Sequence, residues 1–281
     1  MPRWCTYEVP VDTGMFSPVG LQPTAFLRLA FNGAAQWLGR HAISHRRLVS
    51  EHKTGFVIWS ASFISDRPVS FFDADCLEMR VMGRVCGGGT QFACEGQLFG
   101  SFGTAVHVQA TCVPLRLDGD AALSGVPARL CPEVMASFLP DEIETLPHRS
   151  PVPGLQAVVA REGILLARHE RQFTIHRHQC EVADQWFWPE AASLASGGRE
   201  DLIRADADSV PTLRHALGTT VRRLDLLFNR PFFLFDQGVV VSSAHRWKGR
   251  LVFIHELKGI DDDQARALAI EQFAAAGGSW N

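Results

Sequence analysis

A seven-residue pattern that occurs twice constrains the fold of this chain more than any other feature of its sequence. Residues 67–73 read Arg-Pro-Val-Ser-Phe-Phe-Asp and residues 230–236 read Arg-Pro-Phe-Phe-Leu-Phe-Asp, so both follow Arg-Pro-x-x-x-Phe-Asp. A segment with helical spacing of apolar residues precedes each copy, at residues 24–40 and 187–203. Because the pattern and the helical segment before it recur at the same spacing along the chain, the chain is predicted to contain two copies of one structural unit.

Strand-like alternation accounts for most of the remaining residues. The predicted strands are 55–64, 76–85, 91–99 and 105–117 in the first half, and 171–180, 219–229, 239–247 and 251–257 in the second. The Pro-, Gly- and acid-rich segment 118–154 is predicted to link the halves, with a hairpin near Glu162-Gly163 after it. Residues from Asp261 onward have the capping and spacing of a helix rather than of another strand.

Several local features qualify this outline. Thr24 is expected to cap the first helix, whereas Gly197-Gly198 is expected to kink or break the second. The repeated acids Asp73 and Asp236 are predicted to have a structural role, either ending a strand or pairing with the arginines of the pattern, Arg67 and Arg230. The basic cluster between Arg40 and Arg47 is interpreted as the solvated end of a helix.

The order helix, strand, Arg-Pro pattern, glycine turn and antiparallel strands resembles the hotdog fold. The residues that carry the resemblance are 63–81 in the first half and 226–236 in the second, with 176–184 similar to the strand-to-helix segment of thioesterase-type hotdogs. Two such units in one chain resemble the double-hotdog proteins, which include acyl-thioesterases and enzymes of polyketide pathways. The resemblance implies an α+β fold in which two antiparallel sheets, each wrapped around a central helix, form a pseudo-dimer of units 1–140 and 141–281.

The resemblance also implies a function on an acyl-CoA or acyl-carrier-protein thioester. A thioesterase of lipid or polyketide-type biosynthesis is the leading interpretation. The alternatives are a dehydratase, isomerase or decarboxylating acyltransferase on a carrier-bound polyketide intermediate, and a non-catalytic acyl-binding protein. The sequence departs from the Asp-x-x-Gly-His-x-Asn motif of thioesterase-type hotdogs, because residues 184–190 read Asp-Gln-Trp-Phe-Trp-Pro-Glu.

Two carboxylates are the first candidates for catalysis. Glu190 is expected in the first turn of the second central helix, where free N–H groups can stabilise an oxyanion and a carboxylate can activate water. Asp184 precedes it at the end of a strand. Both also have structural explanations, since acids are favoured in first turns and Asp caps turns.

Other candidates are a histidine pair and groups that would contact the substrate. His176 and His178 are expected to share a strand face with Cys180, which suits acid–base catalysis better than metal binding. Asn32 and Gln36 lie four residues apart on the first helix, where an amide could bind the thioester carbonyl. Trp186 and Trp188 are expected either to line an acyl tunnel or to fill the core.

The composition excludes several classes of binding partner. The formal net charge is −3, with no basic footprint for nucleic acid, and no apolar run approaches the ~20 residues needed to span a bilayer. The seven cysteines contain no CxxC or zinc-ligand spacing, which predicts reduced thiols and a cytoplasmic protein. No Gly-rich phosphate loop is present, so no cofactor or metal is expected. A monomer and a homodimer are both compatible with two fused units.

Overall fold

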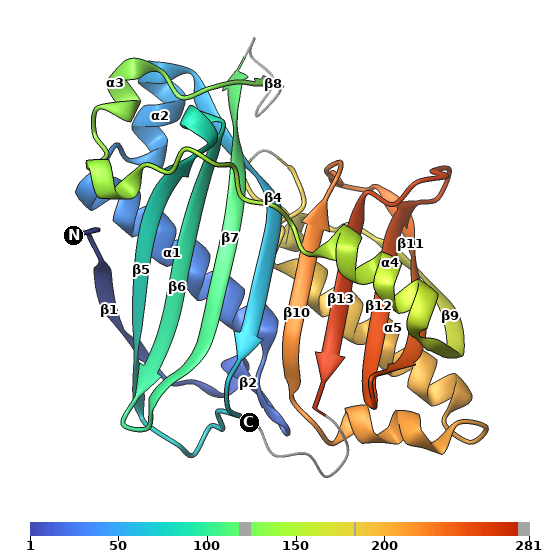
Figure 1. Ribbon diagram of the computed structural model, residues 1–281. Helices are drawn as coiled ribbons and strands as arrows, with labels where there is room; N and C mark the ends of the chain where they lie inside the picture. Colours follow the sequence, from blue (N-terminus) through green and yellow to red (C-terminus); the bar gives the residue numbers. More distant parts are fainter. Residues whose placement is uncertain (118–124, 183, 275–281) are drawn as a thin grey trace.

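The computed structural model describes residues 1–117, 125–182 and 184–274 and forms one long curved sheet with helices on both faces (Figure 1). The strand order is β1-β5-β6-β7-β4-β10-β13-β12-β11-β9, with β8 added beside β7. In the first half the strands are β1 (Cys5–Pro10), β4 (Thr54–Ser65), β5 (Cys76–Cys86), β6 (Gln91–Gly100), β7 (Gly103–Leu117) and β8 (Gly125–Pro127). In the second half they are β9 (Ile164–Thr174), β10 (Val221–Phe228), β11 (Gln237–Trp247), β12 (Arg250–Gly259) and β13 (Ala267–Phe273).

The two halves meet at the centre of the sheet. β4 pairs antiparallel with β10, and Ser62 lies opposite Asp225 in the register. Outward from this pair, the strands follow the order β4-β7-β6-β5-β1 in the first half and β10-β13-β12-β11-β9 in the second. The two orders are equivalent, because in each half the first strand along the chain lies at the edge of the sheet and precedes the long helix. The two expected sheets are therefore joined edge to edge into one.

Each half places one long helix on the same face of the sheet. α1 (Pro23–His41) lies under the first half and α5 (Glu190–Asp206) under the second, while α4 (Val152–Glu162) covers the opposite face of the second half (Figure 1). The shorter helices are α2 (His45–His52) and α3 (Pro132–Met135). Short 3₁₀ turns occupy Thr13–Met15, Gly87–Gly89, Pro140–Glu142, Arg177–Gln179 and Pro211–Leu217, and a small hairpin joins β2 (Phe16–Ser17) to β3 (Gly20–Leu21).

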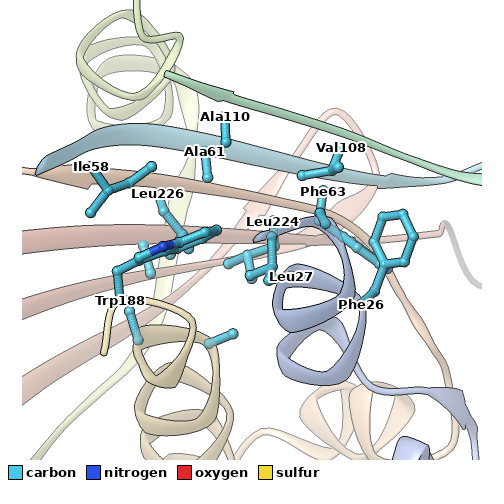
Figure 2. Packing of buried hydrophobic residues seen from close by; sticks show 14 of the residues in the cluster. Phe26, Leu27, Ile58, Ala61, Phe63, Val108, Ala110, Trp188, Leu224 and Leu226 are labelled. Atoms are coloured by element: carbon cyan, nitrogen blue, oxygen red, sulfur yellow. The ribbon is translucent and has the colours of Figure 1, made fainter. Parts of the chain in front are cut away.

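One hydrophobic core runs beneath both halves. Phe26 and Leu27 of α1, Phe63 of β4 and Leu224 of β10 are each at most 1% exposed and belong to the same cluster. Figure 2 shows these side chains between the sheet and the helices, with Trp188 beside them from the segment ahead of α5. Full burial of each large apolar side chain contributes roughly 1.5–3 kcal/mol, so a core shared in this way ties the folding of the halves together.

The repeated acids form equivalent turns. Asp73 Oδ2 accepts a hydrogen bond from the backbone N–H of Ser70 at 2.9 Å, and Asp236 Oδ2 accepts one from the N–H of Phe233 at 3.0 Å. The structural role predicted for both acids is thereby confirmed, and Asp73 also lies 3.7 Å from Arg67 as expected.

The expected pairing of Asp236 with Arg230 is wrong. Arg266 binds Asp236 at 2.6 Å, whereas Arg230 pairs with Asp262 at 3.4 Å. Arg266 comes directly before β13, a strand that the sequence analysis did not predict. The two copies of the turn therefore share their backbone geometry but have different cationic partners.

Other sequence expectations fail where tertiary contacts override local pattern. The residues after Asp261 form a turn and then strand β13, not a helix, because β13 pairs with β10 on one side and β12 on the other. Gly163 ends helix α4 instead of making a hairpin, and β9 follows at once. The first helix begins at Pro23 with Gln22 as its N-cap, so Thr24 does not cap it.

The glycines of α5 do not break the helix. α5 is continuous, and a Cβ on Gly198 would lie 2.5 Å from Ser242 Oγ on β11. Gly33 allows an equally close approach of α1, since its Cβ would lie 2.3 Å from a methyl group of Val81 on β5. Because neither glycine has a side chain, each allows its helix backbone to pack closely against the sheet. Among the described residues, no helix combines the length and apolarity required to cross a membrane.

Candidate active site

A cavity of about 1090 Å³ lies in the first half between helix α1 and the inner face of the sheet. Small or apolar residues of α1 form one wall, and strands β4, β6 and β7 form the other. The segment directly ahead of α5 closes one end, so the cavity combines residues from both halves. It is lined among others by Ala34, Ala35, Leu38, Ile58, Phe92, Cys94, Ala110, Cys112, Glu181, Gln185, Trp186 and Trp188.

Small side chains on the sheet create this cavity. Register counted outward from the central β4–β10 pair places Cys94 and Cys112 at the positions that Phe253 and Phe273 occupy in the second half. These two phenylalanines pack edge to face with ring centroids 5.6 Å apart. The space that is open in the first half is therefore filled by aromatic rings in the second.

An ion pair completes the filling of the second half. Ala110 of the cavity wall has Glu271 as its counterpart in the same register. Gly33 of α1 and Gly198 of α5 both approach the sheet closely and are therefore taken as equivalent positions of the two helices. The residues that follow them, Ala34 and Arg199, are then counterparts. Arg199 Nη1 donates to Glu271 Oε1 at 2.5 Å, with both side chains at most 9% exposed.

The charged pair belongs to a larger buried network. His255 lies between Ser242 Oγ, 2.8 Å from its Nδ1, and Glu271 Oε2, 3.4 Å from its Nε2. Burial alone would raise the pKa of Glu271, but the Arg199 charge and the His255 hydrogen bond hold that pKa well below its ordinary value. The carboxylate therefore stays charged, at a position equivalent to a wall residue of the open cavity in the first half.

Glu181 is the acidic residue of the open cavity. Its carboxyl group forms no hydrogen bond or ion pair with any described residue, and burial raises its pKa. Its backbone N–H donates to the carbonyl of Gln185 at 2.8 Å, and Cys180 bridges to Trp186, so the segment is folded back on itself. A carboxyl group with a raised pKa beside an apolar cavity is suited to proton transfer near neutral pH.

The two tryptophans of this segment also line the cavity, as the sequence allowed. Trp186 is 4% exposed, and its indole Nε1–H has no hydrogen-bond acceptor among the described residues. A buried donor without a partner is costly, so this indole contributes to the wall of the cavity at the expense of one unmade hydrogen bond. Trp188 is 8% exposed and packs edge to face on Phe228 and on Phe31.

Cationic and basic side chains of α2 and of its C-cap residue line the same cavity. These are His45, Arg46 and Lys53, of which the first two belong to the cluster interpreted as a solvated helix end. Both are exposed residues in the first turn of α2, as expected for a solvated helix end, and from there they border the cavity. His45 stacks on Phe56, and burial lowers its pKa.

The cavity thiols are not suited to nucleophilic attack. Burial raises the pKa of Cys94 to about 12, and burial raises that of Cys112 still further. The reactive species of a cysteine is the thiolate, so both side chains act as small apolar wall residues at neutral pH. All seven cysteines of the chain are free, as expected.

The carboxylates predicted from the sequence lie outside the cavity. Glu190 is 8% exposed at the start of α5 and forms an ion pair with Arg28 of α1, in a second cavity on the other side of that helix pair. Asp184 is exposed, has a positive φ of 52°, and pairs with Arg177 at 2.9 Å. Neither acid lines the cavity that holds Glu181.

The other polar residues predicted from the sequence do not line the cavity either. The predicted strand face shared by His176 and His178 is wrong, because β9 ends at Thr174, His176 caps the following 3₁₀ turn and His178 lies within it. Their rings stack with centroids 6.0 Å apart. Asn32 is exposed, and Gln36 accepts a hydrogen bond from Arg40 at 3.3 Å. Sequence reasoning missed Glu181, whose only signal was its place in the segment before the second helix.

Comparison with known proteins identifies the fold. No protein-family model matches the chain, and no curated protein matches it in sequence. Solved structures do match over nearly the whole length. A protein described as an oleoyl thioesterase from Lactobacillus plantarum is 10% identical, with a TM-score of 0.73 over 98% of this chain and 97% of that one.

Two further structures agree. A 12:0-ACP thioesterase from Umbellularia californica is 8% identical, with a TM-score of 0.70 over 97% of this chain and 94% of that one. An acyl-ACP thioesterase from Bacteroides thetaiotaomicron is 9% identical, with a TM-score of 0.64 over 96% and 98%. The chain thus has the α+β fold of these thioesterases, and the resemblance to hotdog-fold thioesterases is confirmed at the level of the fold.

Proposed function

We propose that this protein is an acyl-thioester hydrolase whose acyl group occupies the cavity of the first half. The observation that carries the proposal is an apolar cavity of about 1090 Å³ in which Glu181 has a raised pKa and no hydrogen-bond or ion-pair partner among the described residues. An acyl chain supplies the apolar surface that such a cavity would bury. The proposal is supported by a fold shared with proteins named as acyl-ACP thioesterases.

In the proposed reaction Glu181 is the general base. Its carboxylate takes a proton from water as the water oxygen attacks the thioester carbonyl carbon, which becomes a tetrahedral oxyanion. The C–S bond then breaks, the carboxylic acid is released, and the proton held by Glu181 passes to the departing thiolate. The predicted bases Glu190 and Asp184 remain candidates, but their ion pairs and positions favour Glu181.

The carrier of the acyl group is proposed to be coenzyme A or an acyl carrier protein. Both present a phosphopantetheine thiol, whose phosphate carries negative charge. Arg46 of α2 and Lys53, the residue that caps the C-terminus of that helix, line the cavity and would attract such a group. Val182, which is 99% exposed, lines the cavity from the opposite segment and offers apolar contact to the carrier arm.

The architecture is proposed to be a double hotdog, with units 1–140 and 141–281 forming a pseudo-dimer. The palindromic strand order and the equivalent Asp73 and Asp236 turns support this interpretation. A cytoplasmic location, a place in lipid or polyketide-type biosynthesis, and a monomeric or homodimeric state remain predictions.

Thiol release from a panel of acyl-CoA and acyl-carrier-protein thioesters tests the function. We expect hydrolysis by the wild-type protein and a loss of about 10²–10⁴-fold in kcat for Glu181→Gln. Glu190→Gln and Asp184→Asn are the matched acid-to-amide controls, expected to retain most of the activity. No thiol release on any substrate would exclude hydrolysis, and a full loss in Glu190→Gln alone would move the base to that residue.

The same samples separate hydrolysis from the other reactions considered. Intact-mass analysis of the loaded carrier protein shows loss of the whole acyl group for a thioesterase. Loss of water or carbon dioxide with the acyl group retained would instead indicate a dehydratase or a decarboxylating acyltransferase. Saturable binding of acyl-CoA without any mass change would indicate an acyl-binding protein.

A further inference from the structure

A second cluster of reactive side chains lies where the connection between the halves meets the end of β5. Cys86 Sγ, a carboxylate oxygen of Glu144 and a ring nitrogen of His148 all lie within 4.8 Å of one another. Cys86 is the last residue of β5, and the other two belong to the segment between α3 and α4. None of the three lines the cavity assigned to the acyl group.

We propose that Cys86, Glu144 and His148 form a zinc-binding site. A thiolate, an imidazole and a carboxylate are the ligand types that Zn²⁺ prefers. Glu144 Oε2 lies 3.8 Å from Cys86 Sγ and 3.1 Å from His148 Nε2. Zinc bonds of about 2.0–2.3 Å in a tetrahedron place ligand atoms roughly 3.3–3.7 Å apart, so small side-chain shifts bring these atoms into coordination.

The backbone around the cluster is held in place without the ligand side chains. The N–H of His148 donates to Gln91 Oε1 at 2.7 Å, and its carbonyl accepts from Gln91 Nε2 at 3.3 Å. The N–H of Glu144 donates to the carbonyl of Val85 at 2.8 Å. The ligands therefore project from a fixed frame, which lowers the entropic cost of binding an ion.

Neighbouring groups occupy the atoms that zinc would not use. Arg84 Nη1 donates to Glu144 Oε1 at 2.5 Å, which leaves Oε2 for the ion. Gln109 Nε2 lies 3.3 Å from His148 Nδ1, and with its amide turned over its oxygen would accept an Nδ1–H proton, leaving Nε2 free. On binding, the Cys86 thiol releases its proton to solvent and forms the S–Zn bond. A water molecule would be the fourth ligand of the zinc ion.

The site would fasten the connecting segment to the β5–β6 hairpin. Cys86 is buried, and Glu144 and His148 are half-buried, so the ion would be reached from the side of the connection. A metal held between two segments far apart in sequence stabilises the folded chain only, because the ligands are dispersed when it unfolds. Zinc is thus expected to raise the thermal midpoint without entering the proposed acyl site.

Metal titration of the full-length protein tests the proposal. After dialysis against a chelator, we expect the protein to bind one Zn²⁺ per chain in competition with a chromophoric indicator. Co²⁺ should give a thiolate-to-metal charge-transfer band. Cys86→Ser should abolish that band, and Cys86→Ser and His148→Gln should each weaken zinc binding by at least about tenfold.

Controls distinguish this site from surface binding. Cys180→Ser removes a thiol near the stacked His176–His178 pair and should leave the stoichiometry and the cobalt band unchanged. Circular dichroism and thermal unfolding without metal identify any variant that fails to fold, and Glu144→Gln then provides an independent test. Absence of zinc binding by the wild-type protein, or binding that survives Cys86→Ser and His148→Gln, would overturn the proposal in favour of a hydrogen-bonded cluster. Because the readouts are metal affinity and absorbance, the result does not depend on acyl hydrolysis.

Discussion

The Ser62 hydroxyl donates a hydrogen bond of 2.6 Å to Asp225 Oδ1, and the two residues lie opposite each other in the pair of strands that joins the halves. They are separated by the same number of residues as the two copies of the Arg-Pro pattern. They therefore occupy equivalent positions of the repeated unit and meet at its local axis. Asp225 is fully buried and also binds Arg223 in a two-pronged ion pair, at 2.6 and 3.0 Å.

Removal of this hydrogen bond should weaken the junction of the halves. Ser62→Ala is expected to lower the free energy of unfolding by about 1.5–3 kcal/mol, because a buried carboxylate loses one of its donors. Urea denaturation measures the loss, and a double-mutant cycle with Asp225→Asn isolates the coupling between the two side chains. A coupling energy near zero would show that Arg223 alone stabilises the carboxylate.

Filling the cavity should change the preferred acyl length. Cys112→Phe installs the residue type found at the equivalent position of the second half, Phe273. The ring would displace at least two methylene groups of a long chain, each contributing about 0.8 kcal/mol, so KM for the longest acyl groups should rise about tenfold. Short acyl groups should be affected much less, and Cys112→Val is the control of similar volume. An equal effect at every chain length would place the acyl group elsewhere.

The raised pKa of Glu181 gives hydrolysis a defined pH dependence. The proposed base is active when deprotonated, so kcat/KM should fall as the pH drops through a value above the ordinary ~4.3 of a glutamate. A pH–rate profile measures this acid limb. A profile that stays flat down to the ordinary value would contradict the assignment of Glu181 as the base.

The same pKa predicts a stability effect with the opposite sign. Burial favours the protonated form of Glu181 in the folded state, so its contribution to stability decreases as the pH rises from the ordinary glutamate pKa through the raised one. Glu181→Gln should therefore raise the thermal midpoint at neutral pH while it lowers activity. Below the ordinary pKa the difference in midpoint should disappear.

The ion pair that fills the second half should be costly to break from one side. Arg199→Met leaves the Glu271 carboxylate buried with only His255 beside it, which should cost about 3–5 kcal/mol of unfolding free energy. Arg199→Met with Glu271→Gln should cost less than the sum of the single changes, because the unpaired charge is gone. Arg204→Met, at an 81% exposed side chain, should change stability by less than about 0.5 kcal/mol.

Local pattern predicted much of the fold. Alternation of apolar residues gave β4, β5, β6 and β7 nearly to the residue, because strand periodicity is a property of consecutive side chains. It failed for β13, where acids and alanines resemble a helix, since pairing with β10 and β12 outweighs propensity. It failed again at Gly198, because a glycine within a helix is usually read as a helix breaker. In the structure, α5 continues through Gly198, which packs closely against Ser242.

The candidate site was far less predictable. The sequence pointed to the segment ahead of the second helix and to Trp186 and Trp188, all of which border the cavity. It could not choose among the acids there, because Glu181 and Glu190 differ only in what surrounds them. In the part of the chain that the structure describes, Glu181 has no side-chain partner within an apolar cavity, whereas Glu190 binds Arg28 from a helix more than 160 residues away.

The sequence by itself therefore determined that the chain is a repeat, through two copies of Arg-Pro-x-x-x-Phe-Asp and the strands around them. Only the tertiary structure decided that the copies differ in their interiors. Ala34 and Ala110 face open space, whereas Arg199 and Glu271 meet at the equivalent place. The physical reason is that a cavity depends on side chains facing each other from a helix and a strand distant in sequence, and strand register and helix placement alone bring those residues together.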